Sequence, residues 1–163
     1  LHRAGVEACL TGLHSGEVTS ANGVRVKMDR VLPEIGEEAF LADLEMLILA
    51  GGMDNTIELT CSAQAKRVIA GAADKGCKVA AICAAPVVLA GMGLLNGRKA
   101  VCYPGMEGSM GTADVQVGSK VVVDGSFITG QGPGAAFDFA LKLVEVLKGQ
   151  AVMEQVKEEI HYQ

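Results

Sequence analysis

The feature that most constrains this chain is an apolar strand that ends on a cysteine and passes directly into a helix. It lies in the run KVAAICAAPVVL, residues 78–89. Such a turn holds a side chain at the mouth of a sheet, where the free N–H groups and positive dipole end of the next helix favour a thiolate. Cys83 is therefore a candidate nucleophile. The structural alternative is a small core residue, since a cysteine that ends a hydrophobic strand is often buried and inert.

Strands and helices alternate along the chain. Strands are predicted at 6–10, 24–28, 45–50, 78–83 and 99–102 and in a hairpin over 121–129 that turns at Asp124 and Gly125, and helices at 62–75, 86–92, 135–147 and about 151–160. This order implies a parallel, doubly wound sheet with helices on both faces, which binds ligands beyond the carboxyl ends of its strands. Gly51, Gly52 and Cys83 follow two such strands, so we expect them to converge on one site.

Composition narrows the class of protein. The 163 residues fit one domain, half of them are hydrophobic, and only 4% are aromatic, which suits a sheet core of aliphatic side chains. The formal net charge of −5, without a basic stripe, argues against a nucleic-acid partner. No run is long enough to cross a bilayer and no signal-peptide pattern is present, so we expect a cytoplasmic protein without a membrane partner.

The cysteines and histidines carry no metal-binding pattern. The five cysteines are an odd set without paired short spacings, which argues against a disulfide framework and a zinc site and favours a reducing compartment. Apart from Cys83 we expect them in the core: Cys9, Cys61, Cys77 and Cys102. The alternatives are a place near the pocket for Cys102, which ends another strand, and partial exposure for Cys77, which follows Gly76. We expect the three histidines on the surface: His2, His14 and His161. No nucleotide fingerprint is present, so we expect no metal, nucleotide or flavin cofactor.

Two further segments carry expectations. Residues 1–5 are typical of the last turn of a helix closed by a glycine, yet no helix precedes them, so we expect a missing segment in front of Leu1. In the late helix, Asp138 and Glu145 fall on the polar side and are expected to face solvent.

A set of short motifs, in order along essentially the whole chain, resembles the DJ-1/ThiJ/PfpI superfamily. The set comprises Gly51-Gly52, AAICAAP at 80–86, CYPG at 102–105 and GPG at 132–134. The resemblance implies a flavodoxin-like α/β sandwich that forms a homodimer and carries its reactive thiol at Cys83. Members of the family act in oxidative-stress sensing, protein protection, glyoxalase or deglycase reactions, and, in the PfpI branch, proteolysis.

The resemblance also implies a site. The backbone N–H groups of Gly52 and Ala84 would stabilise an oxyanion, while Gly51, Tyr103 and Pro133 would line the pocket. Two departures stand out. The Glu that the family places on its first strand, beside the cysteine, falls outside this numbering. Some members carry a His where this chain has Tyr103, and a phenol with an ordinary pKa of about 10 is a poor base, which argues against a peptidase.

Three functions follow as alternatives. The first is a cofactor-independent glyoxalase or deglycase in which Cys83 attacks a 2-oxoaldehyde such as methylglyoxal or its protein adducts. The second is a non-catalytic stress sensor or chaperone that uses oxidation of Cys83. The third is a catalytically inactive remnant of the family.

Overall fold

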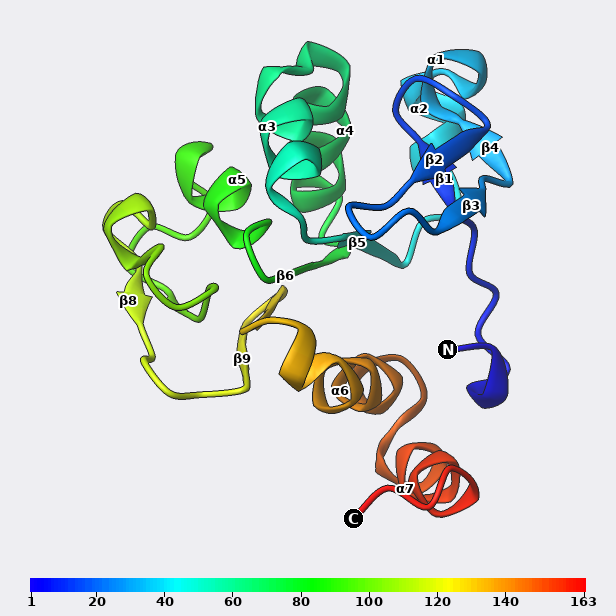
Figure 1. Cartoon of the computed structure of the whole chain (residues 1–163), viewed down its shortest axis with the longest axis vertical. Coiled ribbons are helices and arrows are strands. Elements are labelled where there is room, and N and C mark those ends of the chain that lie inside the picture. The colour runs from blue at the N-terminus through cyan, green and yellow to red at the C-terminus, as the bar shows by residue number, and fades with distance from the viewer.

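The computed structural model describes residues 1–163 and has a four-stranded sheet. The sheet lies at the centre of the molecule (Figure 1). Its strands are, in order across the sheet, β5 (Met46–Leu49), β6 (Lys78–Ile82), β10 (Phe127–Gly130) and β9 (Val121–Asp124). β5, β6 and β10 are parallel, and β9 pairs antiparallel with β10 at one edge. The predicted mostly parallel α/β sheet is confirmed.

Helices cover both faces of this sheet (Figure 1). α3 (Met53–Cys61), α4 (Ala63–Asp74) and α5 (Pro86–Gly91) lie on one face. α6 (Ala136–Lys148) lies on the other, with α7 (Gln150–Glu159) packed outside it. The arrangement is flavodoxin-like, as predicted, and the helices predicted at 62–75, 86–92, 135–147 and about 151–160 are confirmed to within two residues. α3 had no counterpart among the predicted elements.

The central strand explains why the run before Cys83 is apolar throughout. Val79, Ala80 and Ala81 of β6 have no accessible surface, because β6 lies between two strands and between two helical layers. A strand buried on both faces needs an unbroken apolar run. β5, at the sheet edge, instead alternates: Leu47 is buried but Ile48, on the opposite face, is 38% exposed.

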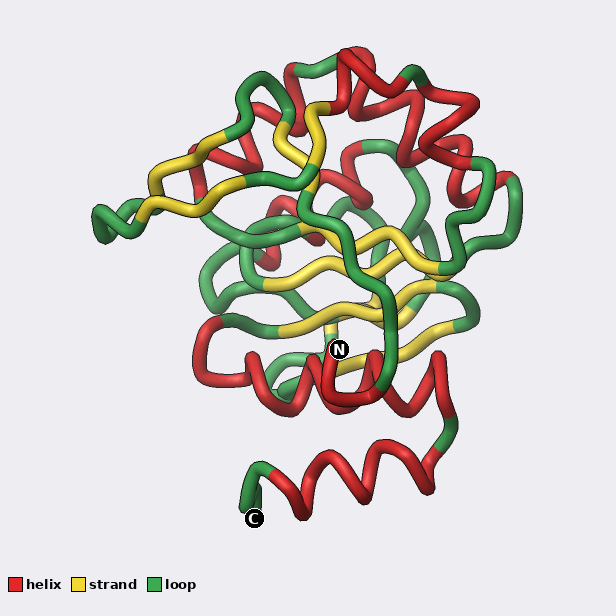
Figure 2. The backbone as a smooth tube through the Cα atoms, turned by 90° about the vertical axis from the view of Figure 1, so that its right-hand side faces the viewer, coloured by secondary structure: helices red, strands yellow, loops and turns green.

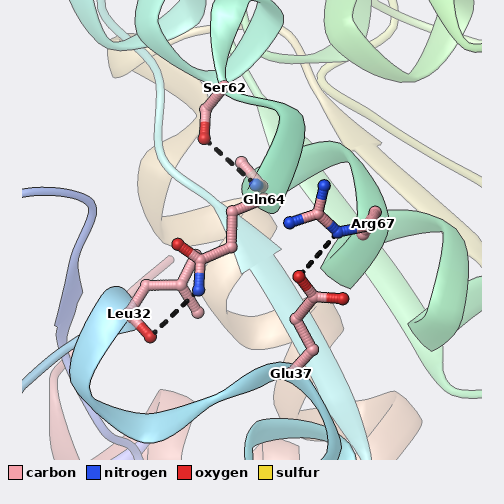
Figure 3. A network of polar contacts seen from close by, with 6 residues as sticks. Leu32, Glu37, Ser62, Gln64 and Arg67 are labelled. Atoms are coloured by element: carbon pink, nitrogen blue, oxygen red, sulfur yellow. Dashed lines mark hydrogen bonds and ion pairs between the residues drawn. The ribbon is translucent and has the colours of Figure 1, made fainter.

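Polar contacts fix α4 against the segment that precedes β5 (Figure 3). The Ser62 hydroxyl accepts a hydrogen bond from the Ala65 N–H at 3.1 Å and so caps the start of α4. Gln64 Nε2 donates to the Leu32 carbonyl at 3.3 Å, and Arg67 Nε lies 2.6 Å from a carboxylate oxygen of Glu37. The predicted start of this helix is therefore confirmed by its cap.

The N-terminal third differs most from expectation. The strand predicted at 6–10 is wrong: pairing begins at β1 (Thr11–Gly12), which is parallel to β4 (Arg30–Val31). A strand needs a neighbour's backbone as well as β-forming residues. Within residues 6–10 only Leu10 pairs with a neighbouring segment. Its carbonyl accepts from the N–H groups of Asp29 and Arg30, and its N–H donates to the Asp29 carboxylate at 2.8 Å.

The remaining elements are short. The strand predicted at 24–28 is confirmed as β3 (Arg25–Lys27), paired with β2 (Glu17–Thr19) in a hairpin that projects from the molecule (Figure 2). The strand predicted at 99–102 is shorter than expected, β7 (Lys99–Ala100), and pairs with β8 (Asp114–Val115). The short helices are α1 (Leu32–Ile35) and α2 (Glu37–Leu41), with single helical turns η1 (His2–Ala4), η2 (Glu107–Ser109) and η3 (Pro133–Ala135). None of the helices is both long enough and apolar enough to span a membrane.

Candidate functional site

Cys83 lies directly after β6 in a backbone conformation that few side chains adopt. Its φ is 68°, in the left-handed region, where a residue with a Cβ is strained by about 1 kcal/mol or more. Two hydrogen bonds hold it there: its N–H donates to the Gly130 carbonyl at 2.9 Å, and its carbonyl accepts from the Tyr103 N–H at 2.8 Å. The strained turn is therefore fixed from both sides, and it leaves the Cys83 side chain partly exposed.

Gly51 lies against this turn from the neighbouring strand. A Cβ placed on Gly51 would lie 2.6 Å from Cys83 Cβ and 3.4 Å from Cys83 Sγ. The parallel register that pairs Leu49 with Ala81 produces this close approach, because β5 and β6 then end side by side and the segments that follow them start next to each other. Gly51 is thus a glycine by necessity, since any side chain would displace the thiol.

Two backbone N–H groups near the turn have no acceptor within the protein. Neither Ala84 N–H, directly after Cys83, nor Gly52 N–H, directly after Gly51, takes part in a hydrogen bond. Ala84 is only 4% exposed, and buried N–H groups without a partner are rare in folded proteins. Such donors are free to bind an oxygen atom of a ligand or of a modified thiol.

Tyr103 and the segment Gly130–Gly134, which we call the Gly-Pro loop, lie beside Cys83. The backbone of Tyr103 is bound to Cys83, and its side chain is 46% exposed. A Cβ on Gly132 would lie 3.2 Å from the Tyr103 ring, so the ring packs against this loop. Pro133, in η3, is exposed. The structure thus gathers the sequence-predicted site residues at the carboxyl end of the sheet.

Cys102 is a contrasting thiol, because it is buried at 3% exposure. Burial, followed by the nearby negative charge of Glu107, raises the pKa of Cys102 to about 11. Glu107 stays ionised because its own N–H and that of Gly105 donate to its carboxylate and lower its pKa. Cys102 is therefore a neutral core thiol at physiological pH, as predicted.

The other candidate residues take no part in this arrangement. Cys77 is buried, which agrees with the expected core position and not with partial exposure, and its thiol donates to the Leu44 carbonyl at 2.9 Å. The core prediction is wrong for Cys9 and Cys61, which are exposed, because Cys9 lies in the unpaired segment before β1 and Cys61 is on the outer side of α3. The three histidines are exposed, as predicted. No group of three or more His, Cys, Asp and Glu residues is close enough to hold a metal ion.

The prediction for Asp138 is also wrong, since its side chain is only 26% exposed and forms an ion pair with Lys120. The sequence contains no local signal for this pair, because the partners lie on different elements. Glu145 forms an ion pair with Lys142 along α6.

Two surface hollows lie away from the Cys83 turn. One of about 440 Å³ is formed by the end of α7 and the residues that follow it, and one of about 340 Å³ by residues before β5 and β6 and at the end of α6. The features that distinguish the Cys83 turn are its backbone geometry and its free N–H groups.

A flavodoxin-like α/β protein with a cysteine on a strained strand-to-helix turn is the class that this fold and site define. The model of the DJ-1/PfpI family matches residues 1–146. The chain belongs to that family.

Proteins of known sequence and structure are similar to this chain over nearly its whole length. Protein dj-1beta of Drosophila melanogaster is 34% identical over 158 residues, 96% of this chain and 82% of that protein; its crystal structure has a TM-score of 0.91 over 99% of this chain and 86% of that one. A deglycase of Pyrococcus horikoshii is 30% identical over 91% of this chain and 87% of that protein. The structure of oxidised DJ-1 from Toxoplasma gondii has a TM-score of 0.90 at 31% identity, over 99% of this chain and 86% of that one.

Proposed function

We propose that the protein is a cofactor-independent enzyme of the glyoxalase or deglycase type, in which Cys83 attacks a 2-oxoaldehyde such as methylglyoxal or its protein adducts. The observation that carries the proposal is the partly exposed Cys83 thiol beside two N–H groups without an acceptor, those of Gly52 and Ala84. The name of the Pyrococcus relative, a deglycase, supports the same chemistry.

The reaction divides into balanced steps. The Cys83 thiolate adds to the aldehyde carbon, and the oxygen that becomes negative is stabilised by the Gly52 and Ala84 N–H groups. A proton then moves from that carbon to the adjacent carbonyl carbon, which converts the hemithioacetal into a thioester without net oxidation. Water hydrolyses the thioester, releases the 2-hydroxy acid and restores the thiol.

The proton transfer needs a base. No carboxylate of the described residues hydrogen-bonds to the Cys83 sulfur, so we assign this role to none of them. The family resemblance places a Glu there, from a segment outside this numbering. The exposed Tyr103 phenol is a poor base at neutral pH, and we propose it as a wall of the site rather than as a proton carrier.

The experiment is to incubate purified protein with methylglyoxal and measure lactate over many turnovers. We expect formation to stop in Cys83→Ser and to continue in Cys102→Ala, a matched control at the buried thiol. Lactate formation by Cys83→Ser at the wild-type rate would refute the proposal.

A second candidate is an oxidation sensor, in which the same free N–H groups bind the oxygen atoms of a sulfenic or sulfinic acid on Cys83. This candidate is supported by the solved structure of a relative from Toxoplasma gondii, which is that of the oxidised protein. A sensor would consume about one equivalent of peroxide per Cys83 to form the sulfenic acid, or about two to form the sulfinic acid, and would produce no lactate over many turnovers. Turnover therefore separates the two candidates.

We also propose a homodimer, on the family resemblance. Light scattering on the purified protein tests it: a dimer mass is expected, and a monomer mass at micromolar concentration would count against it.

A further inference from the structure

The end of the chain returns to the start of α6. α7 follows α6 after the single residue Gly149 and runs back antiparallel to it (Figure 2). The Tyr162 ring stacks on the Phe137 ring, with centroids 5.6 Å apart and planes inclined by 24°. Phe137 lies in the first turn of α6, directly after the Gly-Pro loop. The C-terminus therefore lies beside the segment that enters the candidate site.

A partly buried carboxylate, that of Asp138, joins these parts. Lys120 Nζ lies 3.1 Å from Asp138 Oδ2, and this oxygen is inaccessible to solvent. The Tyr162 side chain, which stacks on the neighbouring Phe137, lies close enough to Asp138 to help lower the pKa of its carboxyl group. Burial alone raises the pKa of Asp138, but the contacts with Lys120 and Tyr162 outweigh it and the net shift is downward. Asp138 is therefore held as a charged group between two partners from distant parts of the chain.

The same lysine contacts the Gly-Pro loop through its backbone. The Lys120 carbonyl accepts a hydrogen bond from the Gln131 N–H at 2.9 Å. One residue earlier, the Gly130 carbonyl accepts from the Cys83 N–H at 2.9 Å. The loop is thus fixed to the Cys83 turn on one side and to Lys120 on the other.

We propose that Lys120, Asp138 and Tyr162 form a latch that positions the Gly-Pro loop beside Cys83, so that the last residues of the chain help to build the site. Glycines give this loop many alternative conformations, and a site wall that moves by about 1 Å can cost a large factor in rate. These three side chains are positioning residues, since none of them touches Cys83. The catalytic consequence rests on the proposed function, whereas the ordering of the loop does not.

The test compares Lys120→Met and Tyr162→Phe with Lys142→Met. The last variant removes a lysine on α6, the helix that carries Asp138, and this lysine pairs only with Glu145. Hydrogen exchange is followed on the peptide that spans residues 130–135, and kcat and KM are measured with methylglyoxal. Tyr162→Phe keeps the ring stack and removes only the hydroxyl, so it tests the latch even where the lysine variant folds poorly.

We expect about tenfold faster exchange in the loop for both latch variants and no change for Lys142→Met. KM should rise about three- to tenfold with kcat within about twofold, because the loop orients the substrate and does not carry out the chemistry. Loop exchange equal to that of Lys142→Met would overturn the latch. Faster exchange with unchanged KM and kcat would overturn its link to the site.

Failure of the proposed function has a different signature. If wild-type protein shows no turnover, the exchange comparison still decides the latch. The rate of Cys83 alkylation by iodoacetamide then replaces KM, and it should differ between the latch variants and Lys142→Met by about twofold or more.

Discussion

The turns after β6 and β7 each place a cysteine near the carboxyl end of a strand, yet the two thiols have opposite surroundings. Cys83 has a left-handed backbone, a partly exposed side chain and a neighbouring N–H group without an acceptor. Cys102 is 3% exposed, and its pKa is raised to about 11 by burial and by Glu107. The position of a cysteine along a strand therefore does not decide its reactivity.

What separates the two turns is backbone geometry. At Cys83 the chain reverses through a strained conformation that hydrogen bonds from two other segments hold in place, and Gly51 leaves room for the thiol. Past β7 the chain continues into the core: the Val101 N–H donates to the buried Thr129 hydroxyl at 2.9 Å, which ties this segment inside. A strained turn that is stabilised by its surroundings points to function, whereas an unstrained buried thiol contributes packing.

The largest expected difference is in alkylation by iodoacetamide at pH 8, measured for each cysteine by peptide mapping. Cys102 should react at least about 100-fold more slowly than the exposed Cys9 and Cys61, because its pKa lies about two units above the ordinary value and burial blocks the reagent. Cys83 should react at least as fast as the exposed pair. In urea all rates should converge. Native rates for Cys83 and Cys102 that agree within a factor of three would remove the distinction between the two turns.

The next effect comes from adding a single methyl group at Gly51. Gly51→Ala should reduce lactate formation about tenfold or more, because its Cβ would lie 2.6 Å from Cys83 Cβ and the thiol must move. The matched control is Gly91→Ala in α5, where a Cβ meets no atom within 4 Å. Wild-type activity in Gly51→Ala, with the control equally active, would show that the close approach does not matter to the reaction.

Local patterns predicted the part of the molecule that surrounds Cys83. The unbroken apolar run of β6 and Pro86 at the start of α5 are signals within a few residues of each other. The cap at Ser62 and the tight turn of the β9–β10 hairpin are similarly local. The order of strands and helices predicted the convergence of Gly51, Gly52 and Cys83 through the parallel sheet. Family resemblance then supplied the oxyanion-binding roles of Gly52 and Ala84.

Contacts between distant residues could not be predicted in this way. The residues 6–10 have the composition of a strand, but strand formation depends on a paired backbone that begins only at Leu10 and Thr11. Asp138 has the helical position of a solvated residue, and its burial depends on Lys120 and Tyr162. In both cases the deciding partner lies outside any local window.

The smallest predicted effect is the dependence of stability on alkaline pH that Cys102 should produce. Its pKa is about 11 in the folded protein and 9.0 when unperturbed, so below pH 9 both states carry the proton. Between pH 9 and 11 the unfolded chain loses this proton and the folded chain keeps it, so stability falls as pH rises, by at most about 1.4 kcal/mol per pH unit.

Urea unfolding of wild type and Cys102→Ala at pH 8, 9 and 10 measures this contribution. Cys102→Ala lacks this thiol, so the advantage of the wild type should shrink from pH 9 to pH 10, while other titrating groups cancel in the comparison. Cys83→Ala serves as the second arm, because it removes the partly exposed thiol of the other turn. If the free energy of unfolding changes with pH by the same amount in both variants and in the wild type, burial does not keep the Cys102 thiol protonated. The contrast between the two turns would then rest on Cys83 alone.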